Sequence, residues 1–136
     1  MLEAEKIVDL LRSNWNSANT ENTIPEIGLI YDYKQIDLSL KDYILVYQGL
    51  SNITPESVGY PAHFGTTRVT IDIRTMNGRE RLEMLRDEVM RIIRTNHRKN
   101  NGFFLITVDS VNDLSDKTIK LYRQVIDVSI SEVMSG

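Results

Sequence analysis

The residues of this chain that come closest to a catalytic pattern are Asp32, Tyr33 and Lys34. In Mg²⁺-dependent nucleases, the carboxylate of such an Asp-x-Lys sequence holds the metal and the lysine stabilises developing charge. A second metal-binding carboxylate has to come from an earlier strand or its end. The nearest upstream candidate, Glu26, is expected on the same strand. A nuclease that uses Asp32 and Lys34 is therefore one alternative function.

Other catalytic and metal-binding patterns are missing from the sequence. The two histidines, His63 and His97, have no second ligand at helical or hairpin spacing, so we predict no zinc or iron site. The absence of cysteine excludes thiolate zinc ligands and a cysteine nucleophile, and it agrees with a reducing compartment. No serine lies in a nucleophile-elbow pattern and no glycine-rich stretch has phosphate-binding spacing. We expect no catalytic residue, no metal and no cofactor, and therefore not an enzyme.

A helix predicted over 78–99 carries seven of the sixteen Lys and Arg residues. Its basic residues are Arg79, Arg81, Arg86, Arg91, Arg94, Arg98 and Lys99. Cations are favoured near a helix C-terminus, and Asp87 is expected to pair with Arg91 one turn away. Arg91, Arg94 and Arg98 are spaced to share one exposed basic stripe at the C-terminal end of this helix. This stripe could bind nucleic-acid phosphates or an acidic partner. Because acidic residues share this helix and the sequence pI is about 5.4, a small nucleic-acid-binding module that uses this basic stripe is a further alternative.

The tyrosines of the first half invite comparison with base-stacking surfaces. They are Tyr31, Tyr33, Tyr43, Tyr47 and Tyr60. Base stacking of this kind is accompanied by interleaved basic residues, but residues 1–66 hold four Lys/Arg against nine Asp/Glu. We expect these tyrosines at the edge of the core or in a protein interface.

The spacing of apolar residues predicts two helices and five strands. The helices are expected at 2–15 and 78–99, where apolar residues recur with helical period. Strands follow from alternation of period two or from short apolar runs, and they are expected at 27–33, 42–48, 68–74, 103–109 and 118–131. In the third strand, Val69, Ile71 and Ile73 should point inward. The parity of apolar residues changes along the last strand, so we predict a bulge or a sharp twist at 123–125.

These elements give the order α-β-β-β-α-β-β in a single domain over 1–136. The fold class is α+β, with two helices packed on one face of a mostly antiparallel sheet. A long loop is expected at 49–66, and it contains Ile53, Tyr60 and Phe64. Connections of this length in a compact domain are uncommon. The loop is expected either to pack on its own sheet or to order against a neighbouring subunit.

The net charge of -3 is unevenly distributed. Residues 67–136 hold twelve Lys/Arg against ten Asp/Glu, so this half is positive while the first half is negative. Complementary patches of this kind favour head-to-tail association between copies. The N-terminus lacks the basic and apolar regions of a cleaved signal peptide, and no apolar run approaches the roughly 20 residues that cross a bilayer. We expect synthesis in the host cytoplasm and no membrane partner.

The element order and four stretches together resemble the tail terminator, or tail completion, proteins of tailed phages and archaeal tailed viruses. The stretches are the polar run Asn14–Pro25, the strand Val69–Thr75, the helix opening Gly78–Leu82, and the segment Leu114–Val128. The same order of elements also underlies the restriction-endonuclease-like fold, which is why the nuclease alternative stays open.

The resemblance implies a structural virion protein without catalytic residues. It implies a homo-oligomer, a hexameric ring at the head–tail junction, that terminates the tail tube and docks it to the neck. The expected partners are the tail tube protein and neck or connector proteins, with DNA passing through the lumen. Another neck or connector protein of the same virion is an alternative. The candidates for interface or charged lumen are Arg79, Arg86, Arg91, Arg94, Arg98, Lys99, Ile53, Tyr60 and Phe64.

Overall fold

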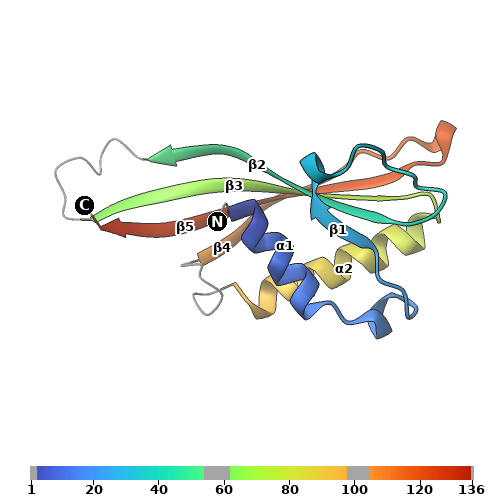
Figure 1. Cartoon of the computed structure of the whole chain (residues 1–136), viewed down its shortest axis with the longest axis horizontal. Coiled ribbons are helices and arrows are strands. Elements are labelled where there is room, and N and C mark those ends of the chain that lie inside the picture. The colour runs from blue at the N-terminus through green and yellow to red at the C-terminus, as the bar shows by residue number, and fades with distance from the viewer. Residues whose placement is uncertain (1–2, 54–61, 98–104, 136) are drawn as a thin grey trace.

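The structure is a computed structural model that describes residues 3–53, 62–97 and 105–135. It has the predicted α+β class: two helices and a mixed, mostly antiparallel sheet of five strands (Figure 1). The helices are α1 (Glu3–Asn14) and α2 (Arg79–Thr95). The strands are β1 (Glu26–Leu29), β2 (Tyr43–Ile53), β3 (Ala62–Thr75), β4 (Leu105–Asp113) and β5 (Tyr122–Ser135). Short 3₁₀ helices, η1 (Ser17–Thr20), η2 (Ile30–Asp32) and η5 (Lys117–Ile119), lie between them.

The strands lie in the order β1-β2-β3-β5-β4. Only the β1–β2 pair is parallel, and it is limited to residues 26–29 against 43–46. The long central pair, β3 with β5, stays in register over its whole length from Ala62–Ser135 to Thr75–Tyr122. β2 and β4 each contain one irregularity, after Gln48 and after Val108. The sheet is therefore built around β3, which has long partners on both sides.

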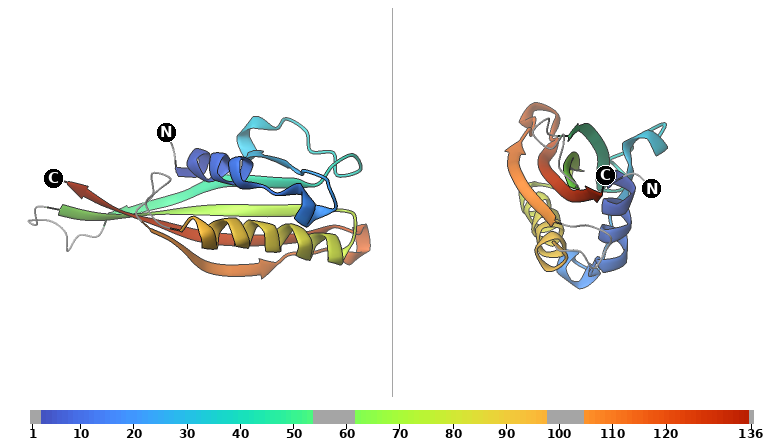
Figure 2. Two further views of the ribbon diagram at one scale, coloured as in Figure 1. Left: turned by 90° about the horizontal axis from the view of Figure 1, so that it is seen from below. Right: turned by 90° about the vertical axis from the view of Figure 1, so that its left-hand side faces the viewer.

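Both helices pack on one face of the sheet, and together they form one hydrophobic core (Figure 2). The predicted inward residues Val69, Ile71 and Ile73 are fully buried, as are Ile7 and Leu11 of α1. α2 contributes a buried stripe made of Leu82, Leu85, Val89, Ile92 and Ile93. Burying each such side chain stabilises the fold by about 1.5–3 kcal/mol, so the alternation of β3 and the stripe of α2 fix which faces meet.

β2, β3 and β5 continue past the ends of both helices and project from the body of the domain (Figures 1 and 2). We call this projecting part the arm and define it as residues 49–53, 62–66 and 131–135. Its three strands are held by backbone pairing, with Ile53 opposite Gly65 and Phe64 opposite Val133. The arm is therefore paired sheet against which neither α1 nor α2 packs (Figure 2).

The predicted loop at 49–66 is wrong in its bounds, because residues 49–53 and 62–66 are strand. Half of these ten residues are Ser, Thr, Asn or Gly, and the apolar residues among them do not alternate with polar ones throughout. Pairing with a long neighbouring strand overrides such weak local preference. The connection that remains, 54–61, lies outside the described residues, and so does Tyr60.

Two strand predictions are corrected by the register. The predicted bulge at 123–125 is wrong, because β5 pairs with β3 without a shift through this stretch. Ile119 lies in η5 and is 60% exposed, so the change of parity marks the start of the strand rather than a bulge. The strand predicted at 27–33 ends at Leu29, where the chain turns into η2. The helices predicted at 2–15 and 78–99 are shorter, because α1 ends at Asn14 and α2 spans Arg79–Thr95.

Candidate functional site

The Asp-x-Lys residues lie on the surface in and after η2. Asp32 and Lys34 are exposed. The carboxylate of Glu26 is occupied by the Tyr33 hydroxyl at 3.2 Å and the Lys41 ammonium at 3.3 Å. Among residues 3–53, 62–97 and 105–135, no group of three His, Cys, Asp or Glu side chains could hold a metal ion. The geometry of the described residues therefore adds no support to the Asp32/Lys34 alternative.

Tyr33, between them, has a packing role. Its ring lies edge-on to Tyr43 with centroids 5.6 Å apart, and its hydroxyl lies 2.5 Å from where a Cβ on Gly28 would be. Burial, followed by the charge of Glu26, raises the pKa of Tyr33. A bare backbone at Gly28 is therefore what lets this ring close over the edge of the sheet.

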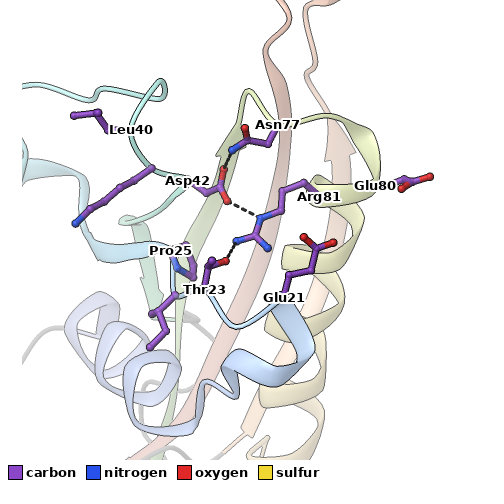
Figure 3. Close-up of a pocket in the computed structure, with 10 residues that line it drawn as sticks. Glu21, Thr23, Pro25, Leu40, Asp42, Asn77, Glu80 and Arg81 are labelled. Carbon is purple, nitrogen blue, oxygen red and sulfur yellow. Dashed lines mark hydrogen bonds and ion pairs between the residues drawn. The ribbon is translucent and has the colours of Figure 1, made fainter.

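The densest polar cluster lies where β2 begins and β3 passes into α2 (Figure 3). The buried carboxylate of Asp42 accepts hydrogen bonds from Thr75 Oγ1 at 2.5 Å, Asn77 Nδ2 at 3.0 Å and Arg81 Nε at 2.7 Å. Arg81 also donates to the Thr20 carbonyl at 2.8 Å. One carboxylate and one guanidinium thus join β2, β3, α2 and η1.

An open pocket of about 500 Å³ lies beside this cluster. Ile24 and Leu40, which are 65% and 79% exposed, line it together with Lys41 and Glu80. The charges at its floor, Asp42 and Arg81, neutralise each other. Among the described residues, the pocket is lined by no activated nucleophile and no set of metal ligands. Its exposed apolar side chains and its paired aspartate and arginine are typical of a contact between packed elements.

Most of the predicted basic stripe is bound within the molecule. Arg79 pairs with Asp113 at 2.8 Å, and hydrogen bonds from Ser115 and then from Arg79 lower the pKa of Asp113 to about 2. Arg86 pairs with its neighbour Asp87 at 3.0 Å. Only Arg94 is exposed with no ion pair to any described residue. Arg98 and Lys99 lie outside the described residues, so the stripe itself is not established.

The predicted Asp87–Arg91 pair is wrong, because Arg91 pairs with Glu88 instead at 2.7 Å. Glu88 is only 2% exposed, and it also accepts hydrogen bonds from the Asn16 amide at 2.7 Å and Asn19 Nδ2 at 2.9 Å. Burial opposes ionisation, but the bonds from Arg91, Asn16 and Asn19 outweigh it and lower the pKa of Glu88. Arg91 further donates to the carbonyl of Asn14 at 2.8 Å. The pair therefore fastens α2 to the end of α1.

A third buried carboxylate lies on the face of the sheet opposite α1 and α2. Asp72 is fully buried and binds Arg123 through both oxygens, at 2.9 and 2.8 Å, and Arg74 at 2.9 Å. Burial, followed by the negative charge of Asp72, raises the pKa of Tyr47 nearby. The alternation in β3 places Asp72 on the face opposite Val69, Ile71 and Ile73, and long neighbouring side chains such as Arg74 and Arg123 cover it there.

The predicted interface residues Ile53 and Phe64 lie in β2 and β3, both within the arm. Tyr60 lies between these strands and outside the described residues. The arm thus brings two predicted interface positions into one projecting sheet, away from the charged residues of α2 (Figure 1). No helix among the described residues is long and apolar enough to cross a membrane.

Comparison with models of known protein families gives no match, and comparison with curated proteins gives none either.

Proposed function

We propose that this chain is a non-enzymatic structural protein of a tailed virus, a tail terminator that forms a ring at the head–tail junction. The ring caps the tail tube and presents a docking surface to the neck. Its partners are further copies of the chain, the tail tube protein and neck or connector proteins, with DNA passing through the lumen. Six copies are expected from the resemblance noted above.

The observation that carries this proposal is the arm. Three strands leave the body as sheet beyond the reach of α1 and α2 (Figure 2), and small sheets without a covered apolar face are marginally stable on their own. An element of this kind is suited to order against a neighbour. A heterologous contact that closes by rotation gives a ring.

The pairing of buried carboxylates with arginines also favours a structural role over a catalytic one. Asp42, Asp72 and Glu88 are buried carboxylates, and each is held by an arginine that ties separate elements together. Such buried ion pairs hold the helices and strands in fixed positions relative to one another. Enzymes more often leave buried titratable groups directed into a cleft, and no such group lines the open pocket except Asp42, which is paired.

The test is to mix the purified chain with tail tubes that lack their terminal ring and to image the tube ends by electron microscopy. We expect a ring at one end of each tube and no further tube growth. A chain that binds the connector and not the tube would replace the proposal with another neck protein. Because isolated subunits of such rings can remain monomeric until they meet the tube, the mass of the free chain is only a baseline.

A nuclease would show Mg²⁺-dependent DNA cleavage that is lost on Asp32→Ala and kept on Asp37→Ala, an exposed aspartate of the same surface segment. A nucleic-acid-binding module would show steep salt-dependent affinity for DNA that Arg94→Glu weakens. Arg94 is preferred over Arg91 for this substitution, since Arg91 holds Glu88. Either result without ring formation on tubes would overturn the proposal.

A further inference from the structure

We propose that neighbouring copies in the ring join by strand addition, in which the free edge of β2 in one copy pairs antiparallel with the free edge of β4 in the next. The inference rests on the proposed ring and names its contact. Strand addition satisfies the backbone donors and acceptors that an edge strand leaves unpaired.

The end of the sheet at β1 is closed to such pairing. β1 covers β2 only over residues 43–46. Its own outer edge is blocked by Arg12, whose Nε donates to the carbonyl oxygen of Ile27 at 2.8 Å. Arg12 belongs to α1, and covering a very short edge strand with a charged side chain from a neighbouring element is one way of preventing edge-to-edge association. The protein thus protects one edge while leaving two others open.

The open edges belong to β2 and β4. From Tyr47 to Ile53, β2 has β3 on one side and no described strand on the other. β4 has β5 on one side, and on its other side the Ile106 amide donates to the carbonyl of His97 at 2.8 Å, so among the described residues its unpaired edge begins at Thr107. These two edges lie on opposite sides of the sheet, as a head-to-tail ring contact requires.

The two open edges lie at the same height along the strands. Through β5, Leu105 of β4 is level with Thr66 of β3, and Asn52 of β2 is opposite the same Thr66. At the other end, Ser110 and Tyr47 are both level with Thr70. A planar ring places its copies at one height, so the edges meet without an axial step.

The strand directions also match. β2 is antiparallel to β3, β3 to β5, and β5 to β4, so β2 and β4 run in opposite directions. Rotation about a ring axis that lies along the strands preserves these directions. The new pair is therefore antiparallel. Level pairing places Asn52 of one copy opposite Leu105 of the next, beside the Ile106 amide that His97 already binds, whereas a shift of two residues places Asn52 opposite Thr107 and keeps that bond. Strand tilt can shift this register by two residues, which keeps the same faces together.

The chain has no cysteine, so introduced cysteines report this contact cleanly. Within one copy, β3 and β5 separate β2 from β4 by three strand spacings, roughly 14 Å, which is too far for a disulfide. Asn52→Cys combined with Leu105→Cys or with Thr107→Cys should therefore form only intermolecular bonds. The matched control is Asn52→Cys with Lys117→Cys, since Lys117 is exposed in η5 at the turn before β5.

The variants are oxidised at high concentration, alone and on tail tubes, and analysed on non-reducing gels. We expect a ladder that ends at the ring size for the first two pairs and at least tenfold less for the control. Rings on tubes with no ladder from either pair would overturn strand addition and leave the ring intact. Absence of rings on tubes for the unmodified chain would overturn the proposed function, and this inference with it.

A second variant tests the edge without a disulfide. Asn52→Lys places a charge on the β2 edge, where lysine opposes strand pairing. We expect an unchanged circular dichroism spectrum and melting temperature of the free chain, with at least tenfold weaker ring formation on tubes. Lys117→Ala should assemble normally. Normal assembly of Asn52→Lys would contradict strand addition at this edge.

Discussion

Buried carboxylates paired with arginine are the main polar residues of this molecule at the smallest scale. Asp72 lies on the face opposite α1 and α2, Glu88 between the two helices, and Asp42 at the joint of β2, β3 and α2. Leaving a buried charge without its partner costs more free energy than the intact pair contributes. Each arginine is therefore expected to matter through the carboxylate that it holds.

Arg123→Ala should lower the free energy of unfolding by about 2–3 kcal/mol, because Asp72 is fully buried and would keep only Arg74. Arg74→Ala is the matched control. It removes one contact instead of two and should cost about 1 kcal/mol. Urea denaturation of the three proteins measures the difference. Equal losses for the two variants would show that the bidentate geometry has no special weight.

Glu88→Gln should change how stability depends on pH. The pKa of Glu88 is lowered in the folded state, so its ionised form contributes stability that is present above the unfolded pKa of about 4.3 and is lost as pH falls through the folded value. The gap in unfolding free energy between wild type and variant should be about 1.5–3 kcal/mol at pH 7 and shrink below pH 4. The contributions of the other carboxylates to the pH dependence are the same in both proteins, so they cancel in the difference between the two unfolding free energies.

Asp87→Asn provides the control for this experiment, because Asp87 is the adjacent carboxylate with a side chain 70% exposed. Its unfolding free energy should stay within about 0.5 kcal/mol of wild type. A gap for Glu88→Gln that is the same at pH 7 and pH 3 would mean that the ionised carboxylate is not what stabilises this joint.

Helices and strands could be predicted from the sequence wherever a periodic pattern of apolar residues marks the face that becomes buried. Val69, Ile71 and Ile73 were assigned correctly because nothing but burial explains their alternation. Glu88 was missed, although its position between Leu85 and Ile92 places it on the apolar stripe of α2 and could have revealed its burial. The extensions of β2 and β3 into the arm could not be predicted, because pairing between distant strands determines them.

Gly28→Ala should destabilise the β1 edge by about 1–3 kcal/mol, since the new methyl group would meet the Tyr33 hydroxyl at 2.5 Å. Tyr33→Phe removes the hydroxyl and relieves the closest contact. The double variant should therefore lose less stability than the sum of the single variants, which a double-mutant cycle by urea denaturation measures. Additive losses would indicate that the ring moves aside freely.

The whole molecule consists of a well-packed body, in which helices cover one face of the sheet, and an arm on which neither α1 nor α2 packs. The body has one hydrophobic core under both helices, whereas the arm depends on backbone pairing among β2, β3 and β5 (Figure 1). Local opening requires little free energy where few apolar contacts are broken. The two parts are therefore expected to differ in stability within one cooperative domain.

Hydrogen–deuterium exchange should distinguish them. In the free chain, amides at 49–53 and 62–66 should exchange at least tenfold faster than those at 69–73, which lie under the helices. In rings on tail tubes, protection should rise at 47–53 and 105–110 and stay constant in α1 and α2. Equal protection of arm and core before assembly would contradict the division into body and arm.

The unbroken register of β3 against β5 has a consequence for how the chain folds. The pair that is closest in sequence, Thr75 with Tyr122, lies beside α2, and the pair that is furthest apart, Ala62 with Ser135, lies at the tip of the arm. Because closing a shorter loop costs less entropy, pairing of β3 with β5 should start beside α2 and proceed residue by residue toward the arm. The arm part of β5 would then pair last, after the body has formed.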